Sequence, residues 1–146
     1  TYLNVVGAGA LLAAVAKWRP RLHLMDWAIG YEWEREQVIM ADCRHDARRK
    51  RAVLRFAPDF PVIPKDVAVG KWMTVEKVVL HEMCHFLTSP LCSEAIDAVA
   101  TARVGDGEGR QITERLYDAN EEVTVSLAKL FWEVHEGSAW DAEPTG

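Results

Sequence analysis

The chain has 146 residues, of which 49% are hydrophobic and 27% charged, and its formal net charge at pH 7 is −5. This length and composition predict one globular domain, residues 1–146, with a single core. The negative charge argues against a nucleic-acid-binding protein. Cys43, Cys84 and Cys92 are odd in number and lack C-x-x-C spacing, which argues against a disulfide framework and favours the reducing cytoplasm.

The first predicted element is a packing helix over residues 1–20. Asn4 to Ala16 is an almost continuous apolar run, and Lys17, Trp18 and Arg19 follow it. The run is shorter than the roughly 20 residues that a membrane span needs, and it lacks the basic leader of a secretory signal. We therefore expect no membrane association.

Three strands are predicted next, at Leu22–Trp33, Gln37–Cys43 and Ala52–Phe56, from their apolar and polar alternation. Between the last two lies the basic stretch Arg44–Arg51. A solvated hairpin loop is the favoured interpretation of this stretch, and contact with DNA is the less favoured one. Prolines then mark an irregular connection to the next helix.

A helix is predicted from Thr74 to Ser89, with Thr74 as its N-cap and Pro90 ending it. Within it, His81, Glu82 and His85 form the pattern H-E-x-x-H. Residues four apart lie on one face of a helix, so both imidazoles can bind one metal ion. With one oxygen ligand they would leave a zinc site with an open position for water, beside a carboxylate that can take its proton.

The remaining ligand is expected on a second amphipathic helix, Ile112–Val134, which carries Glu121 and Glu122 at its centre. Glu121 has the less charged neighbours at helical spacing and is the preferred ligand, while Glu122 stays open as the alternative. Ser93–Val104 predicts a separate helix.

Two segments are predicted without regular structure. The glycine-rich stretch Gly105–Gly109 predicts a flexible loop, after which the ligand helix begins near Gln111. Residues 137–146 predict a frayed tail.

These motifs resemble those of gluzincins, zinc peptidases whose third ligand is a Glu on a later helix. Asn120-Glu121 is similar to the Asn-Glu of thermolysin-like enzymes, although Val125 stands where those enzymes have Asp. The chain also resembles minigluzincins and the small predicted metallopeptidases of phage and prophage genomes. In those proteins a W-x-I strand precedes the zinc motif and a Glu-x-Val-x-x-x-Leu helix follows. Here these elements are Trp27-Ala28-Ile29 and the run that joins Glu121, Val123 and Leu127.

The resemblance implies one Zn²⁺ held by His81, His85 and Glu121, with Glu82 as general base in peptide hydrolysis. The implied fold is an α+β zincin-like domain. In it, a short, mostly antiparallel sheet packs against the N-terminal helix, the H-E-x-x-H helix and the C-terminal ligand helix. The implied setting is the cytoplasm of a bacterial or phage-infected cell, and the implied partner is a peptide or protein substrate.

Some assignments stay open. Tyr117 is a candidate oxyanion stabiliser, because it lies one turn before Glu121, although a packing role is the favoured interpretation. Ala52–Phe56 is the expected sheet edge for pairing with a peptide. The alternative functions are a catalytically silent metal-binding or regulatory domain of phage origin, or a protease recruited to DNA through Arg44–Arg51.

Overall fold

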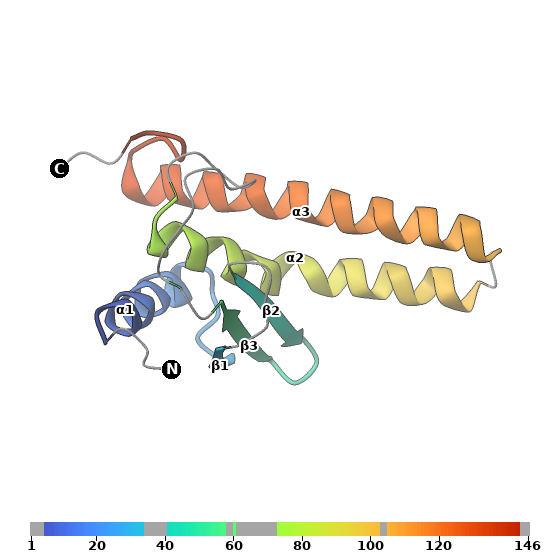
Figure 1. Cartoon of the computed structure of the whole chain (residues 1–146), viewed down its shortest axis with the longest axis horizontal. Coiled ribbons are helices and arrows are strands. Elements are labelled where there is room, and N and C mark those ends of the chain that lie inside the picture. Colours follow the sequence, from blue (N-terminus) through green and yellow to red (C-terminus); the bar gives the residue numbers. More distant parts are fainter. Residues whose placement is uncertain (1–4, 34–40, 58–59, 61–72, 103–104, 144–146) are drawn as a thin grey trace.

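The computed structural model describes residues 5–33, 41–57, 60, 73–102 and 105–143. The elements are α1 (Val5–Arg21), β1 (Ala28–Trp33), β2 (Ala41–Asp46), β3 (Arg51–Phe56), α2 (Val75–Thr101) and α3 (Asp106–Glu136). Helices and a small sheet in one chain confirm the predicted α+β class. Helices α2 and α3 form a long antiparallel hairpin, and α1 and the sheet lie against the N-terminal half of α2 (Figure 1).

The sheet is mixed, with strand order β1-β3-β2. Strand β1 pairs with β3 in parallel, whereas β2 pairs with β3 antiparallel. The expectation of a mostly antiparallel sheet is therefore wrong, and so is the expectation that Ala52–Phe56 forms the edge. Strand β3 is the most buried of the three strands, as a central position requires. Its Leu54 and Phe56 are fully buried, and a central strand gives such side chains cover from both neighbours.

The strand boundaries differ from those predicted. The first strand begins at Ala28, because the chain turns before it with His23 at a φ of 56°. The second strand continues past Cys43 to Asp46, while residues 37–40 lie outside the described ranges. The predicted loop Arg44–Arg51 is therefore a short turn over residues 47–50.

Basic side chains at this turn pair with nearby carboxylates. Arg49 contacts Asp46, and Lys50 contacts Asp26. Arg48 lies 3.6 Å from Glu94 of α2. Part of the positive charge that suggested contact with DNA is thus balanced within the chain.

The predicted N-terminal helix is present as α1, and it packs on α2. Trp18 is fully buried, and its indole Nε1 donates to Glu76 Oε1 at 2.9 Å. Lys17 pairs with Glu76 of α2 and Glu136 of α3, so α1 is tied to both helices of the hairpin. Among the described residues, no helix is both long and apolar enough to cross a membrane.

Helix α2 begins as predicted, since Thr74 accepts a hydrogen bond from the backbone N–H of Lys77. It does not end at Ser89, however. Pro90 lies inside one continuous helix, so the separate helix predicted at Ser93–Val104 is wrong. An interior proline loses one backbone hydrogen bond and costs about 3 kcal/mol. Packing against α3 along the second half of α2 offsets that cost, as where Cys92 Sγ donates to the carbonyl of Leu116.

Helix α3 begins at Asp106, so the loop predicted at Gly105–Gly109 is wrong. Asp106 and Glu108 place negative charge in the first turn, where the helix dipole favours it and compensates for the glycines. The segment is also close to α2, because a Cβ on Gly109 would lie 4.0 Å from the side chain of Val99.

The tail is also more ordered than predicted. Gly137 ends α3 in the left-handed conformation, with φ 68°, which glycine adopts without steric cost. Trp140 then folds back and is 1% exposed, and its carbonyl accepts a hydrogen bond from Lys77 Nζ. The prediction of a frayed tail is wrong up to residue 143, while residues 144–146 lie outside the described ranges.

Candidate metal centre

The N-terminal half of α2 positions two imidazoles in the interior. Its valines and leucines pack in the core, which holds the helix with His81 and His85 turned toward α3. His81 is 4% exposed, and the His85 side chain is 14% exposed. The two rings are perpendicular, with centroids 5.0 Å apart. Both can therefore reach one point between the two helices.

Glu121 completes the arrangement from α3. Its Oε1 lies 3.0 Å from His81 Nε2, and its Oε2 lies 3.2 Å from His85 Nε2. Hydrogen bonds from His81 and His85 hold the pKa of Glu121 well below its usual value. Glu122, the alternative ligand, is exposed and outside this cluster. The antiparallel hairpin thus brings together residues 36 or more positions apart in the chain.

The donor set fits a metal ion. The ligand atoms of His81, His85 and Glu121 all lie within 4.8 Å of one another. A tetrahedral ion bound at about 2.0–2.2 Å keeps its ligand atoms roughly 3.3–3.6 Å apart, so the three side chains need only small shifts to surround one. Two imidazoles and one carboxylate could therefore hold a metal ion here.

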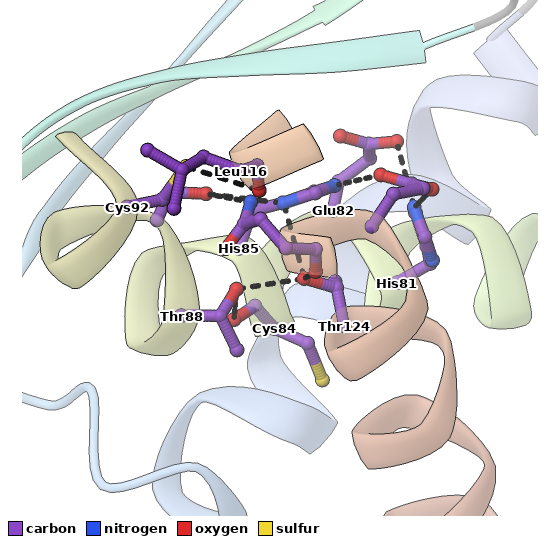
Figure 2. A network of polar contacts seen from close by, with 11 residues as sticks. His81, Glu82, Cys84, His85, Thr88, Cys92, Leu116 and Thr124 are labelled. Atoms are coloured by element: carbon purple, nitrogen blue, oxygen red, sulfur yellow. Dashed lines mark hydrogen bonds and ion pairs between the residues drawn. The ribbon is translucent and has the colours of Figure 1, made fainter. Parts of the chain in front are cut away.

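Glu82 lies beside this cluster, with its Oε1 3.9 Å from His81 Nε2 (Figure 2). It is 7% exposed. Burial raises the pKa of Glu82 well above its usual value, and the negative charges of Glu121 and Asp42 add to this effect. A buried carboxyl group close to a metal centre is a proton acceptor that can also hand the proton on.

The outer ring nitrogen of His85 faces a set of hydroxyl groups (Figure 2). Its Nδ1 lies 3.1 Å from Ser89 Oγ and 3.4 Å from Thr124 Oγ1. Thr124 Oγ1 also donates to the carbonyl of Asn120 at 2.7 Å, and when it does so its oxygen is free to accept a hydrogen from His85. With its hydrogen on Nδ1, His85 would donate to these hydroxyl groups and would leave the lone pair of Nε2 for a metal.

Two further contacts hold these hydroxyl groups in place. Asn120 Nδ2 donates to Ser89 Oγ at 3.2 Å, and the hydroxyl oxygens of Thr88 and Thr124 are 2.7 Å apart. Ser89, Thr88 and Thr124 were not singled out from the sequence. Their spacing could have indicated them, because Ser89 follows His85 by one turn and Thr124 follows Glu121 by three residues.

His81 is supported differently. Its Nδ1 is buried and has no hydrogen-bond partner among the residues that the structure describes. Its Nε2 is therefore the nitrogen with a polar neighbour in this part of the chain, and that neighbour is Glu121.

Strand β2 brings two more side chains to the site, Cys43 and His45, which the sequence analysis does not single out. Burial raises the pKa of the Cys43 thiol, as do the charges of Glu82, Asp42 and Glu121. Burial and the neighbouring His85 lower the pKa of His45. Both residues lie on the face of β2 that packs toward α2. Only the order of the strands, which the sequence did not give, indicates this placement.

Tyr117, the candidate oxyanion stabiliser, is not part of the cluster, and neither are Cys84 and the histidines outside the H-E-x-x-H pattern. The Tyr117 side chain is 59% exposed, and its hydroxyl makes no hydrogen bond within the described ranges. Cys84 is fully buried in the core, where burial raises the pKa of its thiol to about 12. The remaining histidines lie elsewhere: His23 is in the turn before β1, and His135 packs on Trp18 and Phe131.

Comparison with known proteins identifies no relative of this chain. No family model, no curated protein and no solved structure matches the chain. The functional argument therefore depends on the site itself.

Proposed function

We propose that this protein is a zinc-dependent peptidase of the gluzincin type. The observation that carries the proposal is the convergence of His81, His85 and Glu121 within 4.8 Å, with the carboxyl group of Glu82 beside them. A metal centre built for structure alone closes all its positions with protein ligands, whereas three ligands leave one position open.

The donor set favours zinc over harder cations. Imidazole nitrogens suit Zn²⁺, while Mg²⁺ and Ca²⁺ prefer oxygen ligands alone. Zinc bound there would supply Lewis-acid chemistry, polarising a substrate carbonyl and lowering the pKa of a water molecule.

Glu82 has the role of general base and then general acid. It accepts the proton of the attacking water on a carboxylate oxygen and delivers it to the leaving nitrogen of the scissile amide. Its burial keeps competing solvent away from the carboxyl group.

Strand β2 is the proposed binding strand for substrate. Among the described residues it is an edge of the sheet, and it contacts α2. An extended peptide that pairs with its free edge would run past the metal centre through main-chain hydrogen bonds, with little demand on peptide sequence. This replaces β3, which is central and has no free edge.

His45 is the better candidate for oxyanion stabilisation. It lies on this same strand, and after burial the neighbouring His85 is the largest cause that lowers its pKa. Tyr117 is directed into solvent. An imidazole N–H can donate to the negative oxygen that develops during amide hydrolysis.

The test is replacement of Glu82 by Gln, which preserves shape and removes the base. The E82Q protein is expected to bind one zinc ion per chain and to lose at least about 100-fold in hydrolysis of an unstructured protein such as casein. The control is E32Q on β1, which removes an exposed carboxylate and should leave the rate unchanged.

An E82Q protein that cleaves at the parental rate would refute the role of Glu82. The second candidate function is metal binding without hydrolysis, which the exposed position of Tyr117 favours over a complete catalytic site. Zinc uptake with no chelator-sensitive cleavage by the parent protein would select this alternative.

A further inference from the structure

Helix α3 carries an apolar row that extends over most of its length. The row comprises Ile112, Leu116, Ala119, Val123, Leu127, Leu130 and Val134. At 3.6 residues per turn, all of them lie within about 40° of the direction of Val123. Val123 is 57% exposed, Leu130 57% and Val134 69%. Ile112, Leu116 and Leu127 are half-buried, and Leu127 also packs against the core. The exposed large apolar side chains in this row form a patch that is unusual on a monomeric protein.

The row is not the face by which α3 packs on α2. That face carries Thr124 and Ala128, which are fully buried. Thr124 also makes the hydroxyl contact with Thr88. Successive helical residues point about 100° apart, so Val123 is turned to the side of the hairpin.

Helix α2 adds to the same side. In an antiparallel pair of helices, take two residues that face each other across the pair. The residue directly before each of them points to the same side of the pair. Leu87 precedes Thr88 as Val123 precedes Thr124, and Leu87 is 42% exposed. Leu91, one turn later, is 79% exposed. The patch is therefore broadest beside Val123.

The row is symmetric about Val123. Ala119 and Leu127 lie four residues to either side of it, Leu116 and Leu130 lie seven, and Ile112 and Val134 lie eleven. If two α3 helices pair antiparallel about a two-fold axis at Val123, every member of the row meets a member of the row. A surface that matches itself under a two-fold rotation is what an isologous dimer requires.

The charges that flank the row match in the same arrangement. Arg115 and Glu133 lie on the outer flank in the same angular direction, about 80° from the row, and both are exposed. The two-fold axis brings Arg115 of one copy within about one turn of Glu133 of the other, twice per dimer. Flanking charges of this kind set partner choice and orientation in paired helices.

We propose that the protein forms an antiparallel homodimer through this face of α3, with Val123 on the two-fold axis and Leu87 and Leu91 widening the interface. The metal centre stays accessible in the dimer. Glu121 precedes Val123 by two residues and so points about 160° away from the row.

Disulfide trapping tests the geometry. V123C places two thiols at the axis and is expected to give a disulfide-linked dimer under mild oxidation. V134C is the matched control, because Val134 is on the same row and is no less exposed than Val123. In the antiparallel dimer its two copies are separated by about 22 residues of helix, or roughly 33 Å, so it should link no more than the parent protein does.

Charge exchange tests the orientation. In sedimentation equilibrium, R115E and E133R are each expected to raise the dimer dissociation constant about tenfold, because each replaces two attractive pairs by repulsive ones. The double variant R115E/E133R should restore the parental value. V123D should give monomer, with its helix content and zinc uptake unchanged, because the side chain is exposed in the single chain.

A parent protein that remains monomeric at 100 μM or above would overturn the proposal. Self-linking of V134C to the same extent as V123C would also overturn it, since that result requires parallel or random pairing. Failure of the double charge variant to recover the dimer would exclude the two-fold axis at Val123.

Discussion

Glu121 and Glu122 are consecutive residues with different surroundings, and the phase of the helix alone separates them. Both are exposed, but Glu121 turns toward α2 and contacts both imidazoles, while Glu122 lies outside the cluster. Their intrinsic chemistry is the same. The pair therefore provides a controlled test of whether the metal is bound where the geometry indicates.

We expect E121Q to weaken zinc binding by more than the roughly 10–100-fold that loss of an outer-shell partner costs, because the amide removes the only anionic ligand. E122Q should leave the affinity within about a factor of two. The measurement is competition with a chromophoric zinc chelator. Equal loss in both variants would mean that charge near the site matters and that Glu121 does not bind the metal directly.

At the scale of single residues, the sequence predicts the site residues that recur at a fixed helical interval. His81, Glu82 and His85 follow from a four-residue helical interval, and Glu121 from its less charged surroundings. His45 does not follow, because its position beside His85 depends on which strand lies next to α2. Ser89 and Thr124 are common residue types whose role appears only when α2 and α3 are placed side by side.

Helix α2 shows how packing overrides a local signal. Pro90 predicted a helix end, and the structure instead carries the helix to Thr101. The proline stands one residue after Ser89, which contacts His85. Its position allows a test of how much helix stability the chain loses there.

P90A is expected to raise the free energy of unfolding by about 1–3 kcal/mol, because alanine restores the backbone hydrogen bond and relieves the ring contact. Urea denaturation of the metal-free protein measures it. S93A, an exposed change on the same helix, is the control and should stay within about 0.5 kcal/mol. A neutral or destabilising P90A would show that the proline ring packs favourably enough to offset its backbone cost.

The sequence predicts that strands and an amphipathic helix are present, but it predicts neither the strand order nor the hairpin of α2 and α3. Period-two alternation indicates strands, and the apolar spacing of α3 indicates a helix. Neither pattern contains information on strand order, which depends on how the whole sheet covers α2. The glycines near 105–109 similarly suggested a loop, whereas a helix–helix contact along the entire hairpin stabilises helix there.

For the molecule as a whole, the candidate centre joins two long helices that otherwise meet mainly through side-chain packing. His81 and His85 come from α2 and Glu121 from α3, and the unfolded chain cannot keep these groups together. A ligand that binds only the folded state stabilises it by an amount set by its concentration relative to its dissociation constant. Metal binding should therefore be visible in stability even where no substrate is known.

Adding zinc at about 100 times its dissociation constant is expected to stabilise the fold by about 2.7 kcal/mol, and for a chain of this size that raises Tm by roughly 5–10 °C. Removal of zinc with EDTA should reverse the shift. E121Q should show little of it, because its site lacks the anionic ligand. A full shift in E121Q would mean that zinc stabilises the protein elsewhere, for example through the thiols, and would separate the thermal effect from the centre between α2 and α3.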